Sequence, residues 1–98
     1  MKIRYSARAT RDLAAIHEYL LKRSPTGATN VMAVMYAAIE FIRRYPAAAE
    51  MTRIPQVHAK IVRRYRFKIF YRVLAAEDTV EIIHVRHTSR RPWSGADD

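Results

Sequence analysis

A serine–proline pair, Ser24-Pro25, divides the first half of the chain into two segments that both have the apolar spacing of an α-helix. Proline disfavours helical backbone in the residue before it and suits the first position of a new helix, which the serine can cap. In the first segment apolar residues recur at spacings of four, three and four, at Ala9, Leu13, Ile16 and Leu20. In the second they follow a three–four alternation, through Ala28, Val31, Met35, Ala38 and Ile42. The sequence therefore predicts an antiparallel helical hairpin that ends near Tyr45, with Ser6 or Thr10 as the cap of its first helix.

The second half of the chain has the two-residue period of β-strands instead. Residues 47–56 have no clear period and lie between Pro46 and Pro55, so we interpret them as a loop. Residues 60–64, 66–74 and 79–86 are predicted strands, with a hairpin turn at residues 75–78. Residues 2–6 also alternate and predict a short strand before the first helix. In the longest of these strands the apolar face consists of Phe67, Ile69, Tyr71 and Val73.

Together these elements predict an α+β fold in the order β-α-α-β-β-β, with the N-terminal helical hairpin packed on a small, mainly antiparallel sheet. The 98 residues suffice for a single hydrophobic core. We therefore expect one domain over residues 1–94 and a tail of residues 95–98. The chain has no cysteine, no apolar run that could span a bilayer and no signal-peptide core after Met1. These absences lead us to expect a cytoplasmic protein that does not contact a membrane.

The positive charge of the chain is concentrated in its last third. Lys and Arg number 18 against 9 Asp and Glu, a formal net charge of +9. Between residues 60 and 93 only Glu77, Asp78 and Glu81 oppose a series of cations, namely Lys60, Arg63, Arg64, Arg66, Lys68, Arg72, Arg86, Arg90 and Arg91. Like charges on one sheet face repel, so this pattern indicates a surface that binds a polyanion or an acidic protein. The alternative is a solvated face that only keeps the protein soluble. We favour binding because the excess lies on predicted strands and not in a flexible tail.

Arginine and lysine side chains suit contacts with phosphate or carboxylate groups. The residues that we expect to make such contacts are Lys60, Arg64, Lys68, Arg72, Arg86 and Arg90. Among the aromatic residues between them, Tyr65 and Phe70 are the candidates for exposure, although packing is preferred to base stacking for Phe70. Trp93 is expected to fold back over the core, and the alternative is that it borders a phosphate site.

Two histidines, His84 and His87, lie near the end of the last predicted strand. Strict alternation groups the first with Val80 and Ile82 and the second with Val85, so the two imidazoles would point to opposite faces. No third ligand lies nearby, and we expect no metal site. His87 is a candidate general acid or base, or else it donates or accepts a hydrogen bond that holds the C-terminal segment. With only 2 glycines the chain has no phosphate-cradling loop, and we expect no cofactor.

The order of elements and several motifs resemble the RelE/ParE superfamily of bacterial toxins. The motifs are Tyr5…Ala9-x-x-Asp12-Leu13-x-x-Ile16-x-x-Tyr19-Leu20, Ser24-Pro25-x-x-Ala28, residues 67–73 and Val80-x-Ile82-Ile83-x-Val85-x-His87. The resemblance covers nearly the whole chain. It implies the toxin of a type II toxin–antitoxin system, also called a plasmid stabilisation protein. Its partner would be an acidic antitoxin encoded beside it.

The resemblance implies two alternative activities. ParE-like members poison DNA gyrase, whereas RelE-like members enter the ribosome and cleave mRNA with basic sheet residues and a C-terminal tyrosine or histidine. Here Lys68 stands where RelE proteins usually have arginine, and Thr88 follows His87 where an arginine is common. The indole of Trp93 is only a donor and cannot relay a proton. We therefore favour the non-enzymatic, ParE-like activity.

In the mRNA interferase alternative, His87 would be the base and Lys68 or Arg86 the phosphate ligand. A third reading, drawn from the charge alone, is a non-toxic nucleic-acid-binding module.

Overall fold

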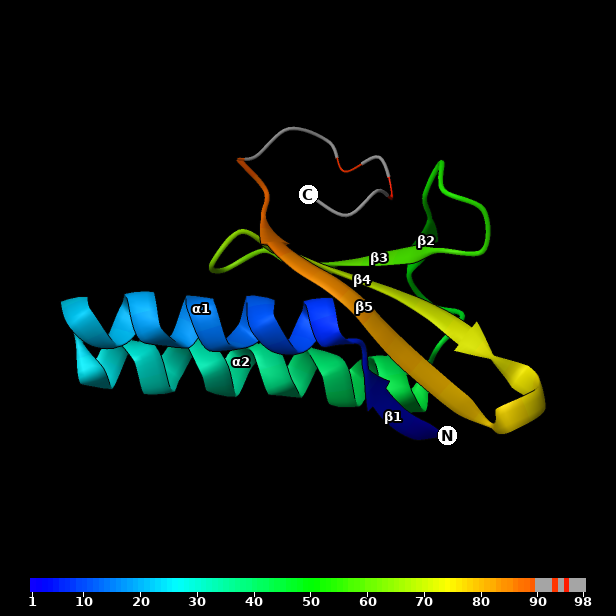
Figure 1. The fold of residues 1–98 in the computed structure, drawn as a ribbon, viewed down its shortest axis with the longest axis horizontal. Coiled ribbons are helices and arrows are strands. Elements are labelled where there is room, and N and C mark those ends of the chain that lie inside the picture. The colour runs from blue at the N-terminus through cyan, green and yellow to red at the C-terminus, as the bar shows by residue number, and fades with distance from the viewer. Residues whose placement is uncertain (90–92, 94, 96–98) are drawn as a thin grey trace.

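Two antiparallel helices cover one face of a mixed β-sheet (Figure 1). The structure is a computed structural model that describes residues 1–89, 93 and 95. Its elements are β1 (Lys2–Tyr5), α1 (Ala7–Arg23), α2 (Pro25–Arg44), β2 (Glu50–Met51), β3 (His58–Val62), β4 (Phe67–Leu74), the 3-10 helix η1 (Ala75–Glu77) and β5 (Thr79–His87). The predicted α+β fold with an N-terminal helical hairpin is confirmed. Among the described residues, neither helix combines the length and the apolar character that crossing a bilayer requires.

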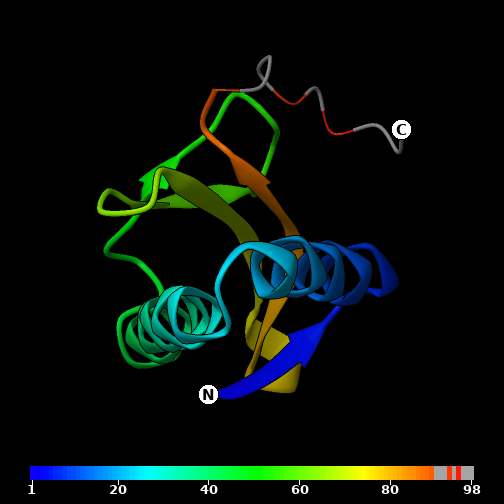
Figure 2. The same cartoon turned by 90° about the vertical axis from the view of Figure 1, so that its left-hand side faces the viewer.

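Two serines begin the helices, as the sequence predicts. The Ala9 amide donates to Ser6 Oγ and the Gly27 amide donates to Ser24 Oγ, each with a donor–acceptor distance of 3.0 Å. Pro25 occupies the first turn of α2, where its missing N–H costs nothing. Because Ser24 alone separates α1 from α2, the helices lie side by side beneath the sheet, as the view along their axes shows (Figure 2).

In the described residues the strand order is β1-β5-β4-β3-β2, with β1 parallel to β5 and the other neighbours antiparallel. Residues 50–51 form a short edge strand inside the segment that the sequence predicts as a loop. Strand β3 spans residues 58–62 and not 60–64, so Arg63 and Arg64 lie in the turn before β4. Both differences arise because cross-strand partners, which local pattern does not reveal, determine where a strand forms.

The core lies between the helices and the sheet face that they cover. The apolar helix positions and the predicted inner face of β4 belong to it or pack against it. Its largest fully buried apolar side chains are Tyr71, Met35, Ile42, Ile69, Ile82 and Val80. The apolar alternation of β4 is therefore confirmed.

Strand β5 contains a β-bulge: at one point it has one residue more than the paired segment of β4. Phe70 pairs with His84, whereas Tyr71 pairs with Ile82, so Ile83 has no partner on β4. An extra residue of this kind reverses the side to which every later side chain points.

The bulge overturns the alternation that the sequence predicts for β5. Ile82 faces the helices before the bulge, and Val85 and His87 do so after it. His84 and Arg86 consequently lie on the opposite side of β5, with Phe70 and Lys68, although His84 still reaches Asp12 at the outer edge of the strand. The prediction that His84 shares a face with Val80 and Ile82 is wrong, although the separation of the two histidines is confirmed.

The beginning of α1 pairs with the outer edge of β5 where β1 ends. The Ser6 amide donates to Ile82 O at a distance of 2.9 Å, and Ser6 Oγ donates to Ile83 O at a distance of 3.0 Å. The Val85 amide donates to Asp12 Oδ2 over 3.0 Å. Backbone groups that would otherwise lie unpaired at this edge are thus satisfied from a helix.

Asp12 also accepts a hydrogen bond from the imidazole of His84, with 2.6 Å between Oδ2 and Nδ1. The side chain of His84 is 1% exposed and that of Asp12 17%. Burial raises the pKa of Asp12, but the hydrogen bonds from His84 and Val85 and the charges of His84 and Arg8 outweigh it and hold this pKa below its ordinary value.

We expect Asp12→Asn to lower the free energy of unfolding at neutral pH by roughly 1–3 kcal/mol, because a neutral amide replaces an ionised acceptor. The folded-state pKa of Asp12 lies below its unfolded value. Its contribution is therefore complete above the unfolded value of about 3.9 and is lost as the pH falls through the folded-state pKa. Urea unfolding at a series of pH values measures this, and the variant should lose less stability toward acid than the wild type.

Asp78→Asn is the matched control. Asp78 is exposed and has a φ of 49°, a conformation that asparagine tolerates well, so its variant should stay within about 0.5 kcal/mol of the wild type. An acid slope that is the same in wild type and Asp12→Asn would contradict the assignment of stability to this carboxylate.

Candidate functional site

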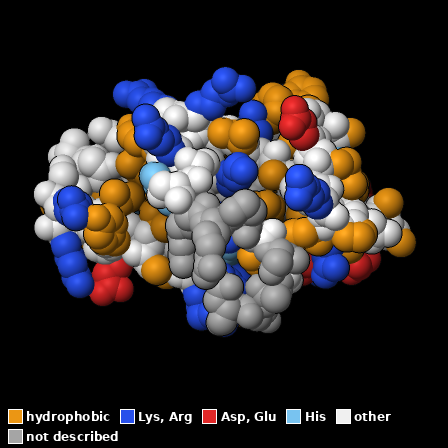
Figure 3. All heavy atoms as spheres, turned by 90° about the horizontal axis from the view of Figure 1, so that it is seen from above, with side chains coloured by type: hydrophobic (Ala, Val, Ile, Leu, Met, Phe, Trp, Pro, Cys, Tyr) orange, Lys and Arg blue, Asp and Glu red, His pale blue; other side chains and the backbone are white. Residues whose placement is uncertain are grey.

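We call the sheet face that points away from the helices the distal face. The side chains on it include Ala59, Ile61, Lys68, Phe70, Arg72, Glu81, His84 and Arg86. Lys68, Arg72 and Arg86 are residues that the sequence predicts as contacts. Figure 3 looks onto this side of the molecule and shows lysine and arginine side chains at several places on the part of it that is visible.

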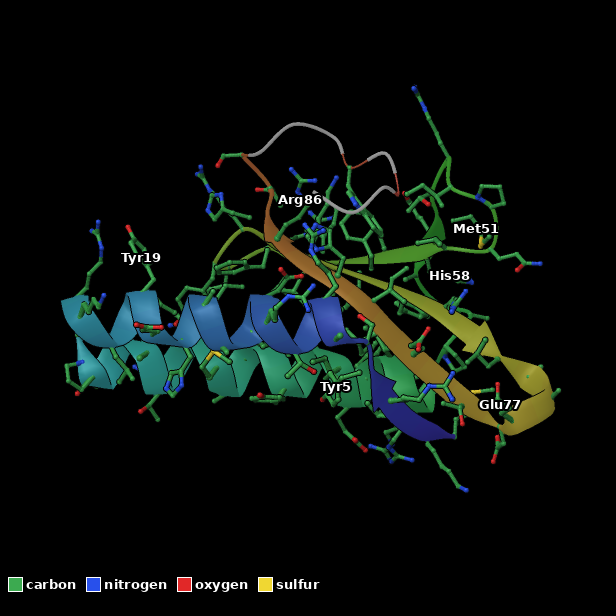
Figure 4. The ribbon with its side chains drawn as sticks, in the orientation of Figure 1. Tyr5, Tyr19, Met51, His58, Glu77 and Arg86 are labelled. Atoms are coloured by element: carbon green, nitrogen blue, oxygen red, sulfur yellow. The ribbon has the colours of Figure 1, made fainter. Side chains whose placement is uncertain are left out.

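Lys68 and Arg86 lie directly opposite each other on β4 and β5. Both are partly buried, and Arg86 lies on the side of β5 away from the helices (Figure 4). Like charges at opposite positions of a sheet concentrate positive potential, and the guanidinium fork suits a two-point contact with phosphate or carboxylate. This cationic pair is the strongest candidate on the distal face for an anionic partner.

Arg72 pairs with an acidic residue on the same face. Its Nη2 lies 2.8 Å from Glu81 Oε1, and Arg4 Nε lies 3.3 Å from Glu81 Oε2. Arg4 also pairs with Glu77 over 3.2 Å. These ion pairs join β1, β5 and β4 and reduce the positive charge around Arg72.

The other predicted contacts do not join the distal face. Lys60 lies on the side of β3 toward the helices, with Nζ 4.6 Å from the centre of the Phe41 ring. Arg64 is exposed in the β3–β4 turn, 5.4 Å from the ring of Tyr65. Arg90 lies outside the described residues. The expectation of a single basic sheet face is therefore corrected: alternation and the turn direct these cations to different surfaces.

Phe70 is buried and not exposed as the sequence suggested, because Trp93 covers it. The two rings meet edge-on with their centres 4.8 Å apart, and Trp93 also lies 4.7 Å from the imidazole of His84. Trp93 folds back onto the sheet, but the predicted place, over the core, is wrong. It covers the distal side of the sheet and not the core beneath the helices.

His87 points toward the helical side of the sheet, away from Lys68 and Arg86. Its ring meets Phe67 edge-on at 5.4 Å. Its Nδ1 accepts from the Ser89 amide over 3.1 Å and lies 2.6 Å from Ser89 Oγ. These contacts match the interpretation in which His87 holds the following segment. The three residues assigned to the interferase alternative are not on one face.

An apolar groove of about 650 Å³ opens between α1 and the ends of β4 and β5. We call it the α1 groove. It is lined by Asp12, Ala15, Ile16, Tyr19, Leu20, Val31, Tyr65, Phe67, Val85, Arg86 and His87. The helical hairpin extends past the sheet here, and Tyr19 lies on that extension (Figure 4).

Sequence reasoning missed the α1 groove and the contact between Asp12 and His84. A signal for the contact was the carboxylate at Asp12, three residues after Ala9 and next to Leu13 on the apolar side of the predicted helix. Nothing in the sequence identified its partner, 72 positions later. In the described residues no three histidine or carboxylate side chains are grouped as a metal site would require.

The chain is similar to known toxins along most of its length. The family described as "ParE toxin of type II toxin-antitoxin system, parDE" matches residues 3–92. A Sinorhizobium fredii protein named "Putative toxin Y4kP" is 30% identical over 90 residues, which cover 92% of this chain and 91% of that protein.

Solved structures share the fold. A chain of the chromosomal ParDE system of P. aeruginosa superimposes with a TM-score of 0.79 at 18% identity, covering 91% of this chain and 97% of that one. The isolated E. coli RelE toxin gives a TM-score of 0.63 at 14% identity, covering 92% and 86%. The family match spans nearly the whole chain and agrees with the motifs and the fold. This protein belongs to the ParE toxin family of type II toxin–antitoxin systems.

Proposed function

We propose that this toxin, when free of its antitoxin, arrests growth in the cytoplasm by binding DNA gyrase and not by cutting mRNA. The observation that carries the choice is the separation of His87 from the Lys68–Arg86 pair by the plane of the sheet. Membership of the ParE family supports the same choice.

Cleavage of RNA needs a base within hydrogen-bonding reach of the attacking hydroxyl and a cation on the same phosphate. A phosphate on the distal face beside Arg86 would lie across the strand from the His87 ring. The ring also packs on Phe67 and receives the Ser89 amide. These contacts favour a binding protein over an RNA-cleaving one.

A RelE-like mRNA interferase is the second candidate. The cationic pair on the distal face and the shared fold with RelE favour it. A non-toxic nucleic-acid-binding module has only the net charge of +9 in its favour.

We assign the antitoxin to the α1 groove. The groove is apolar, about 650 Å³ in volume and bordered by Arg86 in a strongly basic protein. An amphipathic, acidic segment of the antitoxin matches both properties, because apolar side chains fill such grooves and opposite charges speed association. A chain of the E. coli RelBE toxin–antitoxin complex has this fold, with a TM-score of 0.63.

We expect the purified protein to inhibit supercoiling by gyrase and to leave ribosome-bound mRNA intact. Arg86→Ala should weaken the inhibition at least about fivefold, as the loss of a contacting arginine commonly does. Arg72→Ala is the matched control on the same face, and it should have a smaller effect because Arg72 lies outside the Lys68–Arg86 pair, beside Glu81. Supercoiling and mRNA-cleavage assays with the same preparations measure both activities.

The two candidate functions differ in the outcome for His87→Ala. This variant should inhibit gyrase as well as the wild type does. The opposite result would be ribosome-dependent mRNA cleavage by the wild type that is absent in His87→Ala. It would support the interferase and contradict the gyrase proposal.

The groove assignment is tested by binding of the antitoxin encoded beside the gene. Tyr19→Asp should weaken that binding at least about tenfold, because it places a charge in the apolar contact and removes an aromatic anchor. Leu21→Asp is a close control: Leu21 is 45% exposed and Tyr19 55%, but only Tyr19 lines the groove. Calorimetric titration measures both affinities. Equal losses in the two variants would argue that the antitoxin binds elsewhere.

A further inference from the structure

We propose that Asp12 and His84 form a positioning pair that holds the bulge of β5 and thereby sets Arg86 on the distal face and His87 in the α1 groove. Neither residue of the pair touches a partner in this arrangement. The pair acts through the side chains that follow the bulge. The proposal rests on the proposed function only where it assigns Arg86 a contact with gyrase.

The first observation is that helix α1, and not a neighbouring strand, provides the hydrogen-bond partner of β5 at the bulge. Strand β1 ends at Tyr5, opposite Ile82. The Val85 amide, three residues beyond Ile82, donates to Asp12 Oδ2 at a distance of 3.0 Å. Asp12 lies 73 positions before Val85 in the chain. The path of β5 beyond Ile82 therefore depends on α1 and not on a neighbouring strand at this edge.

The second observation is the environment of His84, which lies on the distal face directly after the unpaired Ile83. Its ring is stacked on Phe70 with centres 5.7 Å apart and tilted against Trp93 at 4.7 Å. Its Nδ1 lies 2.6 Å from Asp12 Oδ2, whereas its Nε2 is buried without a hydrogen-bond partner among the described residues. An ionised carboxylate only accepts hydrogen bonds, so Nδ1 has a proton and donates it to Asp12.

One oxygen atom thus receives both bonds that hold the bulge. Asp12 Oδ2 accepts from the backbone of Val85 and from the side chain of His84, while Oδ1 lies 3.5 Å from Arg8 Nε. A carboxylate can accept several hydrogen bonds at once, and ionised acceptors make the stronger ones. Consecutive residues of β5 are therefore attached to a single point on α1.

The position of the bulge has a direct consequence for binding. Because side chains alternate along a strand, a slip of one residue would exchange the faces of Arg86 and His87. The cationic pair of Lys68 and Arg86 would then be lost from the distal face. Holding the bulge at Ile83 is what brings these two cations opposite each other.

Nuclear magnetic resonance of the full chain tests the pair without reference to function. In the wild type, long-range ¹⁵N spectra of His84 should show the proton on Nδ1. In Asp12→Asn a neutral amide oxygen at the position of Oδ2 accepts both bonds more weakly than the carboxylate does, so the share of His84 with its proton on Nδ1 should fall. Exchange of the Val85 amide with solvent should become at least about tenfold faster.

Asp78→Asn is the control and should change neither signal. An unchanged tautomer and an unchanged Val85 exchange rate in Asp12→Asn would overturn the proposal.

Two substitutions at His84 separate the hydrogen bond from the bulk of the ring. His84→Asn retains a donor at the position of Nδ1, whereas His84→Leu removes it. The asparagine variant should keep the exchange rate of Val85 within about threefold of the wild type, and the leucine variant should not. Equal exchange rates in both variants would mean that His84 contributes only packing, which contradicts its role in the pair.

A double-variant cycle with purified gyrase tests the positioning of Arg86. Asp12→Asn and Arg86→Ala should each weaken binding, and the double variant should bind no more weakly than Arg86→Ala alone. Independent, multiplicative losses would show that Asp12 does not act through Arg86, and the positioning role would fail. If the wild type does not bind gyrase, the proposed function fails instead, and the resonance measurements still decide whether the pair holds the bulge.

Discussion

The attachment of α1 to the outer edge of β5 is the constraint on which the rest of this fold depends. Strand β1 is too short to cover that edge, and three backbone groups of β5 are paired instead by Ser6 and Asp12. Buried backbone groups must have partners, so the helix cannot shift along the sheet without leaving some of them unpaired. The same contacts fix the bulge at Ile83, and the bulge decides which later side chains meet solvent and which meet the helices.

The distribution of charge follows from that arrangement. A net charge of +9 could suggest one continuous basic face, but the fold divides the cations of the last third among several surfaces. Lys68 and Arg86 meet on the distal face, Arg72 pairs with Glu81, and Lys60 covers the ring of Phe41. In the part of the chain that the structure describes, the protein therefore presents a cationic pair on the distal face and an apolar groove that Arg86 also borders.

The fold alone does not distinguish the two activities that the sequence resemblance implies. ParE and RelE chains both superimpose on this one, and function depends on the side chains that a shared fold presents. Here the candidate base and the candidate phosphate ligands alternate along β5, with His87 against Phe67 and Arg86 opposite Lys68. That geometry could be anticipated in part, because alternation already separates neighbouring residues of a strand. The presence of a groove beside His87 could not, because α1, α2 and the β3–β4 turn are brought together only by folding.

The sequence by itself determined the elements and the class of fold. Ser24-Pro25 separates the helices, the three–four spacing selects their buried sides, and the alternation from Phe67 to Val73 selects the inner face of β4, because these signals are local to each segment. Only the tertiary structure decided the face of His84, the burial of Phe70 under Trp93 and the partner of Asp12. The reason is that a single unpaired residue in β5 reverses every later side chain, and that residue is selected by a helix that precedes it by some 70 positions.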